Sequence, residues 1–406
     1  MSSKEWYSTT IGDQLLLQRG YDITKAEQRE GIIPVISSSG VTSYHNVARM
    51  KGPGVVLGRK GVVGSVHFVA GDYWPHDTTL FVKDFKGNHP RFVYYFFKWM
   101  SGILASMDVG SANPTLNRNH VHPISVQWPP LPEQNSISAI LSCLDDIIEL
   151  NNGTNQVLEE MAQAIFKHWF VDFEFPNEDG QPYKLRCGEM VESELGEIPN
   201  GWRVMRIGEF ADVKGGKRLP KGHQLQIQKT LHPYIRITDL INGRVDIKNL
   251  LYINDDTYPF ISKYKINKDD IFLSIVGTIG IVGIINEILD EANLTENMAK
   301  ISHIQNHICC KHYLHYYLRS ELGQHLISGR TVGSTQFKLA LYRIKDIPVL
   351  IPSSDCMSKY DQLSRNLYTI IDNNELQNLT LTAIRDTLLP KIMSGEIRVP
   401  IEEAAV

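Results

Sequence analysis

The sequence lacks three features that would assign it to a common class. No stretch approaches the roughly 18 uninterrupted apolar residues that a membrane helix needs, and residues 1–6 contain no apolar core of a secretory signal. A strong positive charge is also missing, because the formal net charge is −4, whereas a nucleic-acid binder is usually basic. We therefore expect a soluble, cytoplasmic protein, in which a basic groove can still coexist with acidic outer surfaces.

Cysteine is scarce, and its spacing does not suit a metal site. The five cysteines are Cys143, Cys187, Cys309, Cys310 and Cys356, and no CxxC pair is among them. Neither a structural zinc site nor a disulfide framework is expected from this set. His312 and His315 follow the adjacent cysteines, but neighbouring cysteines cannot easily ligate one ion, and the run has the pattern of a helix packed against a core. The sequence therefore predicts no metal site.

An internal repeat is the main feature that the sequence does contain. Trp6 and Gly12 recur as Trp202 and Gly208, with the same offset in residue number. Later matches pair 55–64 with 271–280 at a larger offset, and 109–111 with 332–334 at a larger one still. Because the order is kept while the offset grows, we infer one fold present twice, with longer loops in the second copy.

Each copy predicts a mixed α/β domain followed by a long helix. Short β-branched runs with glycine, such as 54–57 and 281–285, predict twisted strands, and helices are predicted near 92–107 and 312–328. The expected fold class is α+β, with two pseudo-twofold-related mixed α/β domains separated by two long antiparallel coiled-coil helices. The predicted boundaries are 1–130 for the first domain, 131–173 for the central helix, 174–200 for an exposed linker, 201–352 for the second domain, 353–396 for the second helix and 397–406 for a tail.

Two heptad patterns predict that the long helices pair. The first has a positions at Ile137, Leu144, Asn151, Leu158 and Ile165, and d positions at Ile140, Ile147, Thr154, Met161 and His168. The offset that relates 109–111 to 332–334 gives Tyr360, Leu367, Asn374, Leu381 and Leu388 at a, and Leu363, Ile370, Gln377, Ile384 and Lys391 at d. Asn151 and Asn374 are the polar a positions expected to fix the pairing register. We expect antiparallel pairing within the chain; the alternative is pairing with a second copy.

The repeat also suggests a kind of ligand. Each helix would extend roughly 55 Å at 1.5 Å per residue, with the two globular segments at opposite ends of the pair. Duplex DNA presents its grooves to the same face at every helical turn, roughly 34–36 Å. Two domains of different sequence at a fixed spacing therefore suit an asymmetric bipartite DNA target, with unread base pairs between its halves.

Five short motifs carry a resemblance to a known family. They are GTIG at 277–280, GSTQ at 333–336, PPLPEQ at 129–134, FKHWFVDF at 166–173 and LLPKIMSGEI at 388–397. Taken together in chain order, and with first-copy equivalents of the first two, they span nearly all 406 residues. The chain resembles the specificity (S) subunit of type I restriction–modification systems. It departs from the usual pattern at Phe337, where proline commonly follows GSTQ, and at Arg59 and Lys60, which replace small or apolar residues.

The resemblance implies two target recognition domains and no catalysis by this chain. It implies double-stranded DNA as the ligand. It also implies a complex with two modification (M) subunits, which carry S-adenosylmethionine and methylate adenine, and with two restriction (R) subunits, which are motor nucleases. No cofactor and no metal are expected on the chain itself. The expected function is recognition of an asymmetric bipartite DNA target and positioning of the M and R subunits.

The sequence does not contain the motifs of the enzymes in such systems. Residues 113–115 do not complete the Asn/Asp-Pro-Pro-aromatic motif of an adenine methyltransferase. The glycines of 277–283 do not form a dinucleotide fingerprint, and there is no Walker lysine motif. Asp172, Glu174 and Lys184 resemble a nuclease cluster, but they lie at a helix end and in the linker, so no nuclease is expected.

Candidate DNA contacts follow from side-chain chemistry, since Arg and Lys pair with phosphates and guanine, whereas Asn and Gln suit adenine. The first domain offers Arg59, Lys60, Ser111, Asn113, Arg118 and Asn119. The second offers Lys214, Lys217, Arg218, Lys221, Thr278, Ser334, Thr335 and Gln336. Residues 214–221 would form either a phosphate-gripping loop or a solvated basic turn. We expect Gly61, Gly64, Gly277 and Gly280 to shape turns, and His76 with Asp77 to have a structural role at a strand edge.

Two alternative functions stay open. The negative net charge allows a coiled-coil adaptor whose globular domains bind proteins. The chain could also serve a system that methylates DNA without a restriction arm. DNA methylation compared with and without the chain separates the adaptor from the DNA-recognition subunit.

Overall fold

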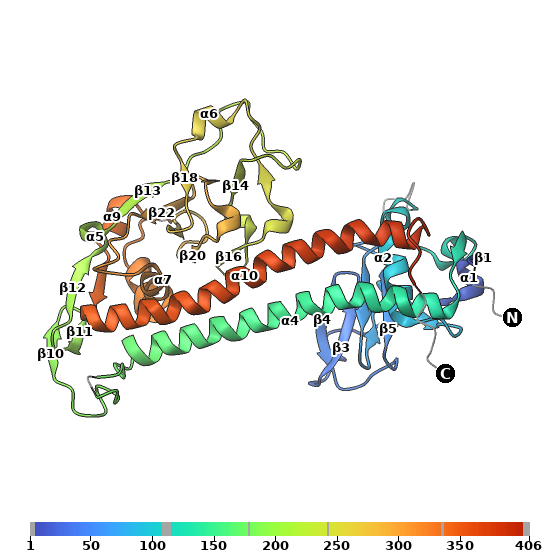
Figure 1. Ribbon diagram of the computed structural model, residues 1–406, viewed down its shortest axis with the longest axis horizontal. Coiled ribbons are helices and arrows are strands. Elements are labelled where there is room, and N and C mark those ends of the chain that lie inside the picture. The colour runs from blue at the N-terminus through green and yellow to red at the C-terminus, as the bar shows by residue number, and fades with distance from the viewer. Residues whose placement is uncertain (1–4, 108–114, 178, 242, 334–336, 401–406) are drawn as a thin grey trace. The chain divides into compact units, whose positions relative to one another are not determined.

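The computed structural model describes residues 5–107, 115–177, 179–241, 243–333 and 337–400. The chain divides into two compact units (Figure 1). The first unit comprises Met1–Leu150 and Gln377–Val406, and the second comprises Asn151–Leu376. Each unit therefore combines one globular segment with part of each of two long helices, α4 (Leu131–Phe170) and α10 (Ser354–Met393).

A four-stranded antiparallel sheet forms the centre of the first unit. Its strands are β2 (Leu16–Arg19), β8 (Thr79–Asp84), β5 (Gly54–Gly58) and β6 (Val66–Val69), in that order. A second sheet has the order β4 (Gly40–His45), β3 (Ile33–Ser37) and β7 (Trp74–Pro75), with β3 and β7 parallel. β1 (Tyr7–Thr10) pairs with β9 (Ser125–Trp128), and the short helices are α1 (Ile11–Gln14) and α3 (Arg118–Val121).

Helix α2 (Pro90–Ser106) covers the central sheet of the first unit and confirms the helix predicted near 92–107. Proline begins the helix, where its missing N–H costs nothing. Phe92, Phe96 and Met100 recur at every fourth position and are all buried, so they form one apolar stripe facing the core. Trp128 packs edge-on against Phe92, with ring centroids 5.2 Å apart. The core of the first unit is therefore built from one face of a helix and one face of a sheet.

The second unit repeats this sheet and adds to it. Its central strands are β13 (Asp212–Gly215), β22 (Met298–Ser302), β19 (Ile271–Ser274) and β20 (Val282–Ile284), in that order and all antiparallel. A further sheet has the order β17 (Leu251–Tyr252), β14 (Pro233–Ile235), β21 (Ala292–Leu294) and β18 (Lys265–Ile266). The two-stranded pairs are β12 (Arg203–Arg206) with β23 (Pro348–Ile351), β15 (Leu240–Ile241) with β16 (Arg244–Val245), and β10 (Met190–Ser193) with β11 (Gly196–Pro199).

The helices of the second unit correct one prediction. They are α5 (Ile207–Phe210), α6 (Tyr258–Ile261), α7 (Lys311–Arg319), α8 (Glu321–Ser328) and α9 (Leu341–Lys345), with 3-10 turns at Ile237–Asp239, Ile247–Asn249 and Glu287–Leu289. The single helix predicted over 312–328 is wrong, because Ser320 separates α7 from α8. Ser320 is extended, and its hydroxyl accepts a hydrogen bond from the Gly323 amide at 3.1 Å, which starts a new helix.

Equivalent hydrogen bonds confirm that one fold is present twice. The Ile11 amide donates to the Ile124 carbonyl at 3.1 Å, and Ile207, its equivalent in the second copy, donates to Ile347 at 3.1 Å. A second recurring bond runs from the Gly64 amide to the Gly58 carbonyl. Its equivalent in the second copy runs from the Gly280 amide to the Ser274 carbonyl, and both are 3.1 Å long. The added length of the second copy lies mainly between β13 and β19, where β15, β16 and α6 have no counterpart in the described part of the first copy.

The long helices pair antiparallel within each unit, as predicted (Figure 1). In the first unit Ile137 and Leu141 of α4 share a core with Leu389 and Ile392 near the end of α10. In the second unit Asn374 donates from Nδ2 to Oδ1 of Asn155 at 2.8 Å, and the rings of Phe170 and Tyr360 lie 4.9 Å apart. Residue numbers rise along α4 as they fall along α10, so the pairing is antiparallel, and both sets of contacts join residues of one chain.

The predicted d positions of the heptads are wrong. Ile140, Met161, Ile370 and Ile384 are among the exposed large hydrophobic residues. The buried positions lie one residue later in the chain, at Leu141, Asn155, Ala162, Ser364, Ile371 and Ile392. Each helix packs against a globular segment as well as against the other helix, so its buried arc is wider than a coiled-coil seam and is rotated away from d. Asn155, the partner of Asn374, was not predicted to pair, although the repeat places Asn378 at the equivalent position of the second helix.

The segment 174–200 is more ordered than the exposed linker predicted for it. It contains the β10–β11 hairpin, and its Phe175 and Ile198 are buried in the core of the second unit. Phe175 stacks on Tyr183 with ring centroids 4.6 Å apart and lies 4.9 Å from the ring of Trp202. Aromatic side chains in a segment rich in Pro and Gly therefore anchor it.

Among the described helices, none has the length and apolar character needed to cross a membrane.

Candidate nucleic-acid interface

The same glycine turn follows a central strand in each unit. Gly61 and Gly64 have φ angles of 79° and 80°, and Gly277 and Gly280 have φ angles of 79° and 93°. These values lie in the left-handed region that favours glycine, so the prediction that these residues shape turns is confirmed. At Gly64 a Cβ atom would also lie 2.7 Å from the Ser101 carbonyl oxygen of α2. The turn is therefore packed closely onto the helix behind it.

Three arginines gather at this end of the sheet in the first unit. Arg59 follows β5, Arg19 ends β2, and Arg118 begins α3. They line an open groove of about 770 Å³ together with polar residues that include Gln18 and Asn117. Burial and the positive charge of Arg19 lower the pKa of Arg59 below its usual value, although an arginine stays protonated in proteins. Because the lining also contains Asp22 and Asp77, the three arginines leave a small positive excess in a protein whose net charge is negative.

Of the other candidates in the first unit, Lys60 lies at the same turn. The amides of Arg59 and Lys60 both donate to the Thr78 carbonyl, at 2.9 Å and 3.0 Å. Lys60 is exposed and forms an isolated bridge with Thr115. Asn119 is exposed in α3. Ser111 and Asn113 lie outside the described residues.

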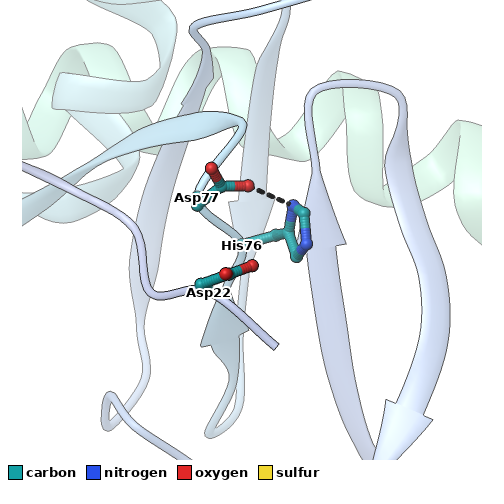
Figure 2. Close-up of side chains that lie close together, drawn as sticks. All are labelled: Asp22, His76 and Asp77. Carbon is teal, nitrogen blue, oxygen red and sulfur yellow. Dashed lines mark ion pairs between the residues drawn. The ribbon is translucent and has the colours of Figure 1, made fainter. Parts of the chain in front are cut away.

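Asp22, His76 and Asp77 form an Asp–His–Asp group (Figure 2). Each of Asp22, His76 and Asp77 offers a ligand atom within 4.8 Å of the others, so this group could hold a cation. One carboxylate oxygen of Asp77 lies 3.2 Å from His76 Nδ1, and the other lies 2.9 Å from Arg19 Nη2. Since Arg19 already matches the charge of Asp77, the geometry favours a polar network over a metal site. His76 directly follows β7 and its amide donates to the Ile36 carbonyl at 2.8 Å, which agrees with the strand-edge role predicted for the pair.

The basic segment of the second unit is part strand and part loop. Lys214 lies within β13 and pairs with Asp212 at 3.1 Å, so the prediction that it belongs to a loop is wrong. Lys217 and Lys221 follow the strand and are exposed, and the Lys217 ammonium lies 5.6 Å from the ring centroid of Tyr264. Arg218 Nε donates to Glu296 at 2.6 Å. An exposed basic loop therefore begins where β13 ends.

Of the remaining candidates of the second unit, Thr278 lies at its glycine turn. Thr278 is exposed, and its carbonyl accepts a hydrogen bond from the Ser274 hydroxyl at 2.6 Å. Val276 bridges Lys338, just as Lys60 bridges Thr115 in the first unit. Ser334, Thr335 and Gln336 lie outside the described residues.

Cys309, Cys310, His312 and His315 belong to the core, as the sequence predicted. All four are buried at the start of α7. Burial raises the pKa of the Cys310 thiol to about 12 and lowers the pKa of His312 to about 3. The His312 ring stacks on Tyr368 with ring centroids 4.3 Å apart. These side chains are therefore neutral packing groups.

Comparison with known proteins identifies the family. The model of the type I restriction modification DNA specificity domain matches residues 3–160 and 199–378, which is most of the chain and both copies of the repeat. The chain belongs to this family of specificity subunits. It is 30% identical to the MjaIX specificity subunit of Methanocaldococcus jannaschii over 321 residues, covering 76% of this chain and 69% of that protein. It is 23% identical to the HindI specificity subunit of Haemophilus influenzae, covering 70% and 71%.

A solved structure shares the fold of this specificity subunit. The type I S subunit from M. genitalium aligns with a TM-score of 0.60 at 16% identity and covers 97% of both chains. The predicted fold class, mixed α/β domains with two long antiparallel helices, is thus confirmed. The specificity subunit is the non-catalytic DNA-recognition member of its system, as expected.

The sequence of the specificity subunit did not predict that Asp77 has an acidic equivalent, Glu296, in the second unit. The His76 amide donates to Ile36, and the Thr295 amide donates to Ile235 in the same way, at 2.8 Å and 3.1 Å. The next residues, Asp77 and Glu296, are therefore equivalent. Each carries a carboxylate that binds an arginine, and Arg19 was not among the candidates. An internal alignment of the segments before β8 and β22 would have found the acidic pair.

Proposed function

We propose that this specificity subunit recognises an asymmetric bipartite DNA target, with one half read by each globular segment. One observation carries the proposal: the two units repeat the same backbone hydrogen bonds but place different side chains at the same edge. Arg59 and Lys60 are replaced by Ile275 and Val276, directly before the equivalent glycines of the two turns. A shared scaffold with exchanged edge residues is what two different half-sites require.

The side chains at this edge suit DNA. Lys60, Lys217 and Lys221 are exposed and can neutralise phosphates, whereas Arg, Asn and Thr side chains can also reach base edges. We propose as contacts Arg59, Lys60, Arg118, Asn119, Lys214, Lys217, Arg218, Lys221 and Thr278, together with Ser111, Asn113, Ser334, Thr335 and Gln336. The domain boundaries that we propose are 1–130, 131–173, 174–200, 201–352, 353–396 and 397–406.

The long helices offer equivalent surfaces for two copies of one partner. Val157 and Met161 of α4 are 54% and 47% exposed. The repeat places Thr380 and Ile384 at the same positions of α10, where they line a shallow, largely apolar cavity of about 600 Å³. Exposed apolar surface that recurs in this way favours protein docking. We propose that two modification subunits bind there, that two restriction subunits complete the complex, and that it acts in the cytoplasm, where it meets the DNA.

The test is a comparison of adenine methylation in cells that express the modification subunit with and without this chain. We expect one gapped, asymmetric methylated motif that is present only when the chain is expressed. Identical methylation in both cells would contradict DNA recognition and favour the protein-binding adaptor. Loss of methylation without any effect on DNA cleavage would indicate a methylation-only system.

A further inference from the structure

The acids Asp77 and Glu296 hold equivalent positions, but the arginines that they bind come from different places in the two copies. Arg19 ends β2 and reaches Asp77 with Nη2 at 2.9 Å. Arg218 lies in the loop beyond the end of β13 and reaches Glu296 with Nε at 2.6 Å. The acid is thus the shared part of the arrangement, and the arginine is supplied separately in each unit.

Both guanidinium groups keep N–H donors for a ligand. The side chain of Arg218 is 79% exposed, and that of Arg19 is 56% exposed. The bond from Arg218 to Glu296 uses Nε, so it leaves the two parallel N–H groups of Nη1 and Nη2 available. Arg19 is bound through one N–H of Nη2. The second N–H of Nη2 remains and is parallel to a donor on either Nη1 or Nε. Each arginine can therefore still present two parallel donors.

The acid also decides which part of DNA the arginine suits. Burial alone would raise the pKa of Glu296, but the hydrogen bond from Arg218 lowers it below its usual value, so the carboxylate is charged at neutral pH. A charged carboxylate repels phosphates and cancels much of the attraction of its arginine for them. It also holds the long side chain in one orientation, as base reading requires. Lysines that pair with no acid among the described residues, such as Lys221, suit phosphates better.

We infer that Arg19 and Arg218 each read a guanine, through its O6 and N7 atoms, in the half-site bound by their own unit. Asp77 and Glu296 are positioning residues that act through these arginines. The inference rests on the proposed function and adds the base and the side chains. Arginine bonded to O6 and N7 is the commonest specific contact in the major groove. Because the two arginines reach the acid from different positions, the guanine need not lie at the same place in the two half-sites.

The experiment uses the full chain in complex with its modification subunits and a duplex that contains the methylated motif. Each guanine of the motif is replaced in turn by 7-deazaguanine, which keeps O6 but lacks the N7 acceptor. For the wild-type complex we expect weaker binding at one guanine in each half-site. Arg218→Ala should weaken binding to the natural duplex about 5- to 150-fold. It should also remove the sensitivity to 7-deazaguanine in one half-site only.

Three further variants complete the design. Arg19→Ala should remove the sensitivity in the other half-site. Glu296→Gln keeps the shape of the side chain but loses its charge, and it should reduce sensitivity at the guanine assigned to Arg218. Arg206→Ala is the matched control, because Arg206 pairs with Glu194 at 2.7 Å on the surface of the same unit. It should leave every sensitivity unchanged.

Three results would overturn the inference. The first is an Arg19→Ala or Arg218→Ala variant that stays as sensitive to 7-deazaguanine as the wild type. The second is an equal loss of affinity for specific and nonspecific duplexes, which would indicate phosphate contacts. The third is a motif without guanine in either half-site. If the wild-type complex prefers no sequence at all, the proposed function itself is wrong, so the two failures are distinguishable.

Discussion

Arg244 is the residue whose loss should most clearly loosen the second recognition segment from the helices. It lies in β16 and forms ion pairs with Glu159 of α4 and Glu375 of α10. Asn286 donates to the same Glu375 carboxylate at 2.6 Å, and the Tyr316 hydroxyl donates to Glu159 at 3.0 Å. One guanidinium therefore joins a surface hairpin to both helices.

The cost of Arg244→Ala can be worked from these contacts. The side chain of Arg244 is 39% exposed, and those of Glu159 and Glu375 are 23% and 25% exposed. A hydrogen bond to a charged group contributes about 1.5–3 kcal/mol, whereas an exposed ion pair contributes about 0–1 kcal/mol. This half-exposed pair of contacts lies between those limits, and its loss leaves two carboxylates close together. We expect a loss of about 2 kcal/mol, which lowers the melting temperature of the second unit by roughly 4–8 °C.

The assay is thermal unfolding of the full chain at neutral pH, with hydrogen exchange of the β15–β16 hairpin as a local readout. Arg365→Ala is the matched control, because the ion pair of Arg365 with Asp361, at 2.8 Å, lies within α10. Such a pair contributes about 0.3–0.5 kcal/mol. Arg244→Lys should recover part of the loss, since a lysine keeps the charge but not the fork of donors. Equal melting temperatures for the alanine variants at 244 and 365 would refute the reasoning.

Three other predictions concern pH, the glycine turn and the division of the target. Burial raises the pKa of Asp372 to about 6. Ionisation of a group with a raised pKa lowers the free energy of unfolding as the pH rises above about 4, and the full cost is present above about 6. Asp372→Asn should therefore stabilise the chain by about 1–2 kcal/mol at pH 7.5 after allowance for solvent screening, and have little effect near pH 4; a gain that is the same at both pH values in denaturant titrations would argue against this. Gly64→Ala should destabilise the first unit by at least about 1–3 kcal/mol, because of its positive φ and the close Ser101 carbonyl. Gly71→Ala, where a Cβ meets nothing within 4 Å, should be neutral in the same melting experiment. Exchange of residues 1–130 for the first domain of another specificity subunit should change one half of the methylated motif, and a change in both halves would contradict independent reading.

The two long helices and the internal repeat could be predicted from local sequence patterns. Which face of each helix is buried could not. The heptads located α4 and α10 correctly, because apolar spacing along a helix is a local property. They placed Ile140 and Ile384 in the seam, yet both side chains are exposed. Which arc of a helix is buried depends on every neighbour, and the globular segments that pack on these helices are far away in sequence.

The candidate site shows the same division. Its glycines were correctly assigned to turns, because a left-handed backbone position can be anticipated from residue type. Arg19 and Asp77 were not connected, since they are far apart in the chain and only the pairing of β2 with β8 brings them to within 2.9 Å.

The sequence by itself determined the repeat, the two long helices, the family and the absence of catalytic motifs. Each of these depends only on residue types and their spacing along one chain. Only the tertiary structure decided which asparagine pairs with Asn374 and which acid binds each arginine. Those partners come from segments that are distant in the chain, and their distances are set by sheet order and helix rotation. A spacing pattern along the chain contains neither quantity.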